Sequence, residues 1–252
     1  MRWTGPLESA ALLTVLPVPA RAAASTRGVL PWAPLVGLVL GAAAAGVAVI
    51  GGRLVSPLAG AVLAVAVLAL LTRGLHLDGL ADTADGLGPI RQRERALQVM
   101  HQGDVGPFGV VTLVLVLLLQ VAGLAALLPA DHGWLAVVTS VVGGRVAMAR
   151  TGLPGGTAAE GSALGRLVVG TVSSRWLVGW GVGVAALLAL GAAGDPAVIW
   201  RLVIAATAGG AAAEMLHRRA VRRLGGVTGD VMGAMNEVST AATLLVAAAL
   251  LH

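Results

Sequence analysis

Seven apolar stretches, each about as long as a membrane-spanning helix, dominate the hydropathy pattern of the chain. They cover residues 33–51, 55–72, 108–128, 133–150, 176–193, 197–215 and 235–251. A helix needs about 20 predominantly apolar residues to cross the hydrocarbon layer of a bilayer. The pattern therefore predicts a polytopic protein with about seven transmembrane helices.

A shorter apolar stretch precedes the first of these, at residues 7–19. With Arg2 before it and Arg21 among small residues after it, the stretch resembles a signal peptide with its cleavage site. Pro17 and Pro19 would break a helix there, however. We therefore favour a short N-terminal helix that lies in the interface or enters the membrane only part of the way.

Short links and long polar segments alternate between the stretches. The short links are residues 52–54, 129–132 and 194–196, and the long segments are residues 73–107, 151–175 and 217–234. All 17 basic residues are Arg, and all but Arg53, Arg145 and Arg201 lie in the N-terminal part or in the long segments and their flanks. The positive-inside rule then places the N-terminus and the long segments in the cytoplasm, and seven crossings leave the C-terminus outside.

The composition agrees with this reading. Hydrophobic residues make up 57% of the chain and charged residues only 12%, which excludes an ordinary water-soluble globular domain. Aromatic residues are only 3%, which favours an all-α fold packed through small residues over a β-barrel with aromatic girdles. Because topology accounts for the net charge of +5, we expect no nucleic-acid partner. No Cys is present, which excludes a thiolate nucleophile. We treat residues 1–252 as a single transmembrane domain in the cell's inner membrane, in contact with its lipids.

The first long polar segment concentrates acidic residues in an otherwise acid-poor chain. Asp78, Asp82 and Asp85 are spaced i, i+4 and i+7, so on a helix they would share one face. Such close carboxylates repel one another unless a cation lies between them, and hard oxygen ligands suit Mg²⁺. The alternative is a solvated acidic surface, but interleaved leucines favour a pocket next to the membrane. We predict that all three bind the metal and that Asp82 and Asp85 take part in catalysis. His76 is either a proton shuttle or phosphate donor, or only structural.

A second acidic pair, Asp230 and Glu237, lies at the start of the last apolar stretch, again seven residues apart. A helix N-terminus that attracts acids would explain Asp230 but not Glu237. We expect both to complete the metal or substrate site. Arg145, inside a predicted span next to Gly143 and Gly144, should pair with phosphate or with a site carboxylate. Further arginines are available to bind a pyrophosphate or to mark topology and contact lipid; they are Arg91, Arg93, Arg95, Arg218, Arg219, Arg222 and Arg223.

Carboxylates, a hard metal and arginines at the membrane surface indicate a transferase that acts on a diphosphate of a bulky or lipid-like substrate. Rival readings are a CDP-alcohol phosphotransferase, a prenyltransferase and a cation-coupled transporter. The run from Asp78 to Ala81 imitates the opening of the first, but position 82 is Asp where that motif has Arg. A transporter should hold its acids near mid-bilayer, whereas these lie at the cytoplasmic end.

The whole run from Gly74 to Gly86, GLHLDGLADTADG, resembles the signature of the cobalamin synthase family. Support comes from Leu16-Pro17-Val18-Pro19, from Arg27-Gly28 and from the segment Gly225 to Asp230. The resemblance implies an Mg²⁺-dependent ribazoletransferase. In that reaction a hydroxyl of α-ribazole, or of its 5′-phosphate, attacks the cobinamide-side phosphorus of adenosylcobinamide-GDP and displaces GMP.

One departure from the family pattern concerns a further carboxylate. Where many members read Asp-Ser-Arg after the Met of the following helix, this chain has Gln102-Gly103-Asp104. We expect Asp104 to replace that carboxylate from two positions away and to contact substrate. The sequence leaves open whether copies of the chain assemble into a homo-oligomer.

Overall fold

The computed structural model describes residues 4–22, 25–88 and 90–251, and within them the regular elements are helices, apart from one isolated bridge between Ala158 and Val227. The helices are α1 (Gly5–Leu13), η1 (Ala20–Ala22), α2 (Val29–Leu54), α3 (Pro57–Leu71), α4 (Leu75–Leu87), α5 (Arg93–Met100), α6 (Pro107–Leu127), α7 (Gly133–Ala149), η2 (Arg150–Gly152), α8 (Ala163–Val168), α9 (Ser174–Gly191), α10 (Pro196–Leu224) and α11 (Gly229–Leu251). The predicted all-α fold is confirmed.

Each of the seven apolar stretches overlaps one long helix, in the order α2, α3, α6, α7, α9, α10 and α11. Among the described residues, five of these helices (α2, α6, α9, α10 and α11) are long and apolar enough to cross a bilayer, and α3 with α4 would form a sixth span bent by 90°. Helix α7 is apolar but has only 17 residues, and most of them are buried against other helices. The chain is therefore a multi-pass membrane protein, while the count of seven stays a prediction.

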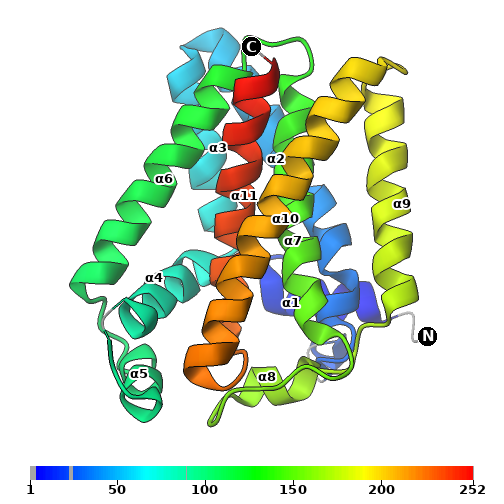
Figure 1. Cartoon of the computed structure of the whole chain (residues 1–252). Helices are drawn as coiled ribbons and strands as arrows, with labels where there is room; N and C mark the ends of the chain where they lie inside the picture. Colours follow the sequence, from blue (N-terminus) through cyan, green and yellow to red (C-terminus); the bar gives the residue numbers. More distant parts are fainter. Residues whose placement is uncertain (1–3, 23–24, 89, 252) are drawn as a thin grey trace.

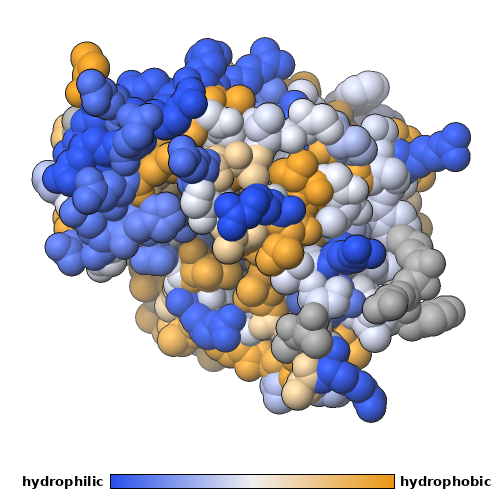
Figure 2. Space-filling model, turned by 90° about the horizontal axis from the view of Figure 1, so that it is seen from below, coloured by the Kyte–Doolittle hydropathy of each residue, from blue (hydrophilic) through white to orange (hydrophobic). Residues whose placement is uncertain are grey.

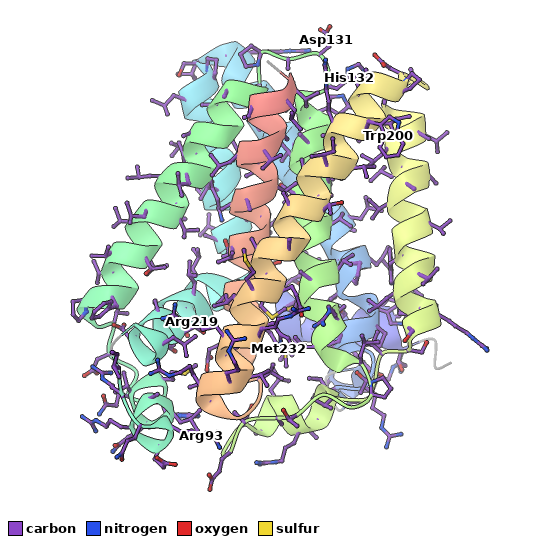
Figure 3. All side chains as sticks on the ribbon, in the orientation of Figure 1. Arg93, Asp131, His132, Trp200, Arg219 and Met232 are labelled. Carbon is purple, nitrogen blue, oxygen red and sulfur yellow. The ribbon has the colours of Figure 1, made fainter. Side chains whose placement is uncertain are left out.

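The long polar segments gather at one end of the bundle. In Figure 1, α1, α4, α5 and α8 lie at the lower end together with the turn between α10 and α11, whereas the short links and the C-terminus lie at the upper end. In Figure 3, Arg93 and Arg219 mark the lower end, and Asp131 and His132 mark the upper end. Seen from below, hydrophilic residues are densest on the side of α5 (Figure 2). This arrangement is the one that alternating short and long connections predict.

Small residues allow the central helices to approach one another closely. A Cβ added to Gly37 or Gly41 of α2 would lie only about 3.2 Å from atoms of α7, and one added to Gly144 of α7 would meet Asn236 and Thr240 of α11. Close backbone approach through small residues is the usual way that helices associate in membranes. Helices α7 and α11 therefore form the middle of the bundle.

A sharp turn directs the acidic segment across the lower end of the bundle. Arg73 and Gly74, between α3 and α4, have positive φ angles of 55° and 66°. Gly adopts this left-handed conformation without steric cost, whereas Arg does not. The Arg73 guanidinium donates a hydrogen bond of 3.0 Å to the carbonyl of Leu12, which ties the turn to α1. Helix α4 consequently lies at 90° to α3, outside the helices that run the length of the bundle.

Candidate active site

Helix α4 carries the acidic segment, which the hydropathy pattern placed in a loop between spans. Its three carboxylates occupy three environments: Asp78 is exposed, Asp82 is half-buried and Asp85 is buried. His76 faces the interior and is only 2% exposed. The helix therefore leads from solvent at Asp78 into the protein at Asp85.

The second acidic segment begins helix α11, where Thr228 organises the first turn. The Thr228 hydroxyl donates to the Asp230 carboxylate at 3.2 Å and accepts from the backbone N–H of Val231 at 3.1 Å. Gly79 of α4 lies directly against this turn, because a Cβ added to it would be 2.7 Å from the backbone oxygen of Asp230. Only a glycine at position 79 lets α4 and α11 bring their acids together.

Asp82 lies among like charges. Burial raises the pKa of Asp82 to about 6, and the carboxylates of Asp78, Asp230 and Asp85 add to the increase. One of these neighbours, Asp230, comes from the other end of the sequence. A cation held among these groups would relieve both the repulsion and the desolvation of the charged form.

His101, at the end of α5, is a candidate that sequence reasoning missed. It lies close enough to Asp82 and Asp230 to interact with both electrostatically. Its Nδ1 is hydrogen-bonded to the carbonyl of Leu97, which can only accept, so Nδ1 carries the proton and Nε2 of the neutral ring is left as an acceptor. No fixed spacing connects His101 with the acids, so only the folded chain reveals their proximity.

A cavity of about 420 Å³ opens beside these residues. Its polar lining comes from His76, His101, Ser162, Thr228 and Asp230, and most of the remaining wall is apolar. A largely apolar cavity with a few converging polar groups is typical of a small-molecule site.

The imidazole of His76 forms part of the cavity wall. Neither of its ring nitrogens has a partner among the described residues. Burial, with a contribution from the positive charge of Arg145, lowers the pKa of His76 well below its ordinary value. The ring is therefore neutral at physiological pH and has one donor and one acceptor that no described residue satisfies.

Asp85 is already engaged by the protein. Its Oδ2 accepts a hydrogen bond of 2.7 Å from the backbone N–H of Gly106, at the N-terminus of α6. A Cβ added to Gly106 or Gly109 would collide with the Asp85 carboxylate, so both glycines make room for it. Asp104, two residues before Gly106, is exposed in the connection between α5 and α6. Asp85 thus fixes the start of α6 beside the acidic helix.

Glu237 and Arg145 lie deeper in the bundle. Glu237 is about 10 Å farther along α11 than Asp230, given the rise of an α-helix. Its carboxylate accepts hydrogen bonds from Gln120 at 2.8 Å and from Asn236 at 2.9 Å. Arg145 and Glu237 line the same small cavity and interact electrostatically, although they form no direct ion pair within the part of the chain that the structure describes. They form a polar core separate from the acids at the lower end.

Several arginines of the long polar segments bind backbone carbonyls. Arg91 donates to the carbonyl of Asp85 at 3.2 Å, and Arg219 donates to that of Leu87 at 3.1 Å. Arg223 donates to the carbonyl of Arg91 at 3.3 Å. These contacts fasten the end of α4 to α10, so part of the arginine set holds the acidic helix in place.

Comparisons with known proteins identify the family of the chain. The family model described as cobalamin-5-phosphate synthase matches residues 6–248. The chain belongs to the cobalamin-5-phosphate synthase family. That match includes every candidate site residue described above.

The chain is similar to several proteins named adenosylcobinamide-GDP ribazoletransferase. The chain is 40% identical to an adenosylcobinamide-GDP ribazoletransferase of Frankia casuarinae, over 94% of this chain and 91% of the relative. It is 41% identical to the enzyme of that name from Nocardioides sp., over 94% and 95% of the two chains. For the one from Bradyrhizobium diazoefficiens the identity is 37%, over 96% and 92%. No solved structure matches the chain.

The structure of this family member brings only part of the predicted site together. Asp78, Asp82 and Asp230 lie near one another at the lower end, and His76 and Asp230 line the adjoining cavity. Asp85 faces the start of α6, Asp104 is exposed, and Arg145 and Glu237 lie in the interior. Among residues 4–22, 25–88 and 90–251, no three His, Asp or Glu side chains lie close enough together to hold a metal ion by themselves.

Proposed function

We propose that this protein is an adenosylcobinamide-GDP ribazoletransferase, which joins α-ribazole or its 5′-phosphate to adenosylcobinamide-GDP and releases GMP. The family match and the names of the relatives support this activity. The structural observation that carries it is the meeting of Asp82 of α4 with Asp230 of α11 beside a 420 Å³ cavity. The product is adenosylcobalamin or its 5′-phosphate.

The donor set fits Mg²⁺. This ion usually binds one or two protein carboxylates together with water and substrate phosphates, and it needs no cage made only of protein ligands. One or two of Asp78, Asp82 and Asp230 would hold it together with substrate phosphate, and the mutual repulsion of these carboxylates favours a cation. Bound there, Mg²⁺ would neutralise charge on the diphosphate. Asp85, which the sequence predicts as a further ligand, would have to give up its bond to Gly106 to bind the metal, so we propose that its main role is to support the fold.

The reaction forms one phosphorus–oxygen bond and breaks another. The ribazole hydroxyl attacks the phosphorus next to cobinamide, and the bond from that phosphorus to the bridging oxygen breaks, so that the oxygen leaves with GMP. His76 would donate a hydrogen bond to a substrate phosphate, because neither of its ring nitrogens has a partner among the described residues. His101 would take the hydroxyl proton through its free Nε2. Positioning of the two substrates would supply much of the rate enhancement.

The membrane topology completes the proposal. We infer that α2, α3, α6, α7, α9, α10 and α11 all cross the inner membrane, with the N-terminus and the active site on the cytoplasmic side. The arginines of the lower end support this orientation through the positive-inside rule. Soluble nucleotide substrates would then reach the site directly from the cytoplasm.

An assay of the purified protein in detergent tests the activity. We expect GMP to be released from adenosylcobinamide-GDP in the presence of α-ribazole and Mg²⁺, and chelation with EDTA to stop its release. The variant Asp82→Asn should lose the activity while still inserting into the membrane. Asp131→Asn, an exposed acid at the opposite end, is the matched control and should remain active. Full activity of Asp82→Asn would overturn the assignment of the metal site.

A further inference from the structure

A second cavity, of about 460 Å³, lies between α7, α9 and α10, away from the acidic site. Its wall is almost entirely apolar along its length, from Leu188 to Leu177 on α9 and from Val203 to Ala213 on α10. Only one end is charged, where Arg150 and Glu214 contribute to the lining. A long apolar cavity with one charged end has the layout of an amphipathic ligand.

Glycines keep this cavity open. Gly143 of α7, Gly181 of α9 and Gly210 of α10 all line it. A Cβ added to any of the three would have no atom within 4 Å. These glycines therefore do not serve close helix packing, unlike Gly37 or Gly144, and the space in front of them is free.

Helix α9 contacts the bundle mainly near its two ends. At the lower end, the indole N–H groups of Trp176 and Trp180 both donate to the carbonyl of Pro31, at 2.6 and 3.0 Å. At the upper end, Gly191 lies against Leu135, and Leu188 is the only buried residue of the helix. Between these contacts Val184 and Leu187 are only partly buried against the core, and the cavity occupies the remaining space in front of the inward face of α9.

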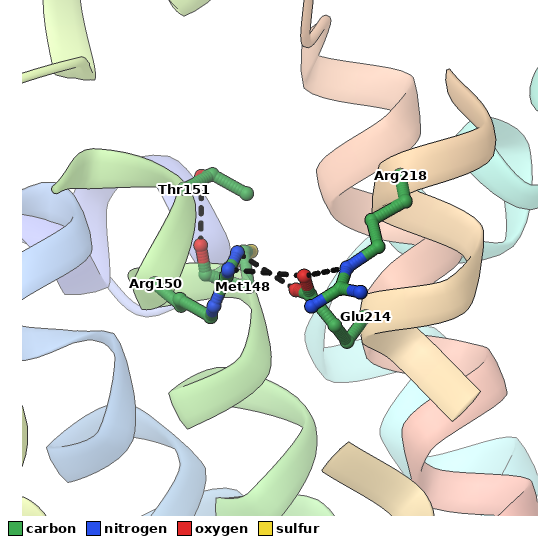
Figure 4. A network of polar contacts seen from close by, with 5 residues as sticks. All are labelled: Met148, Arg150, Thr151, Glu214 and Arg218. Carbon is green, nitrogen blue, oxygen red and sulfur yellow. Dashed lines mark hydrogen bonds and ion pairs between the residues drawn. The ribbon is translucent and has the colours of Figure 1, made fainter. Parts of the chain in front are cut away.

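The charged end holds two guanidinium groups on one carboxylate. Arg150 bonds to Glu214 at 2.8 and 3.1 Å, and Arg218 bonds to the same carboxylate through Nε at 2.7 Å (Figure 4). The buried hydroxyl of Thr151 donates to the carbonyl of Met148 at 2.8 Å and fixes the chain beside Arg150. The arginine side chains remain 41% and 68% exposed, and together with Glu214 they leave one net positive charge. The cluster can therefore accept a further anion.

We propose that this cavity binds one membrane phospholipid with an anionic headgroup. One acyl chain lies in the apolar part between α7, α9 and α10, and the phosphate contacts Arg150 and Arg218 at the lower end. The chain thereby completes the packing of α9, and the arginines select the headgroup. This site is independent of the transferase activity proposed above.

Lipid retained by the purified protein tests the proposal. We would incubate the detergent-solubilised full chain with dioleoyl phosphatidylglycerol or dioleoyl phosphatidylcholine and count bound lipids by native mass spectrometry. The double variant Gly181→Leu and Gly210→Leu fills the cavity without meeting a protein atom at Cβ. Its control is Gly179→Leu and Gly183→Leu, two glycines of α9 that also face open space but do not line the cavity.

We expect the wild type and the control to retain phosphatidylglycerol, and the filled variant to retain about tenfold less, because losing the burial of ~2 methylene groups already costs about that factor. Arg218→Gln should reduce the preference for phosphatidylglycerol over phosphatidylcholine about fivefold. Equal retention by filled and control variants would overturn the proposal, as would equal retention of the two lipids by the wild type. The wild-type comparison keeps the test decisive if the filled variant does not fold.

Discussion

Substitutions at Asp85 distinguish two roles of the acidic helix α4, which are to stabilise the fold and to bind the substrate. The buried Asp85 carboxylate accepts the backbone N–H of Gly106 at 2.7 Å, at the point where α6 begins. The first N–H groups of a helix have no partner within the helix, and Pro107 at its first position has none to offer. Asp85 therefore satisfies a donor that would otherwise remain unpaired by protein at this half-buried position.

The magnitude follows from this geometry. Asn at position 85 keeps an oxygen acceptor but loses the charge, and a hydrogen bond to a charged group is worth about 1 kcal/mol more than a neutral one. Ala removes the acceptor, which leaves the Gly106 N–H unsatisfied at a cost of about 1–3 kcal/mol. It also removes a negative charge from a helix N-terminus, worth about 0.3–1 kcal/mol. We expect a loss of stability of about 1 kcal/mol for Asp85→Asn and about 3 kcal/mol for Asp85→Ala.

Thermal unfolding and GMP release, measured in the same detergent, distinguish the two roles. Both variants should melt at lower temperature than the wild type, Asp85→Ala more so. Well below its melting temperature, Asp85→Asn should keep most of its activity, unlike Asp82→Asn. If Asp85→Asn instead abolished GMP release and left the melting temperature unchanged, the structural role would be refuted and Asp85 would be a ligand or a catalytic group.

Three further substitutions test other parts of the site. Gly79→Ala should abolish most of the activity, because the new Cβ would press against the backbone of Asp230 and separate α4 from α11. The control Gly46→Ala, whose Cβ would have no atom within 4 Å, should keep its activity. Equal activities of the two variants would contradict the close approach of α4 and α11. His101→Gln should lower kcat for GMP release with little change in stability, and an unchanged kcat would exclude it as the base. Glu237→Gln should lower the melting temperature clearly and change kcat little, because it removes the negative charge that balances the buried Arg145. A loss of activity without a change in melting temperature would instead place Glu237 at the substrate.

The helices could be predicted from hydropathy because the bilayer imposes a length on every apolar stretch. Each predicted stretch overlaps a helix, and the alternating links place the polar segments at one end. Hydropathy predicts a helix less well where the helix is short or where the chain bends. The acidic segment was expected in a loop, but the positive φ angles of Arg73 and Gly74 start a new helix there.

The acids of the site could be found because carboxylates are rare in this chain, but their partners could not. Spacing within one helix shows which residues share a face, and it predicts that His76 faces away from the acids of α4, although the fold places His76 beside Asp230 of α11 in the cavity wall. Contacts between helices depend on how closely their backbones approach, and here that approach rests on Gly79 against Asp230. The same limit explains why His101 was missed, since its relation to Asp82 exists only after α5 folds back.

The three acids of α4 also show why a motif alone does not assign roles. Identical side chains repeat at i, i+4 and i+7, yet the helix lies across the end of the bundle, so successive positions on its face pass from water into the protein. Asp78 is exposed and free to meet a soluble substrate, and Asp82 lies at the boundary, where burial and neighbouring charges raise its pKa. Asp85 has reached the interior, where a buried carboxylate needs a donor and finds Gly106. The direction of α4, set by the turn at Arg73 and Gly74, therefore determines which acid can react and which must hold the fold.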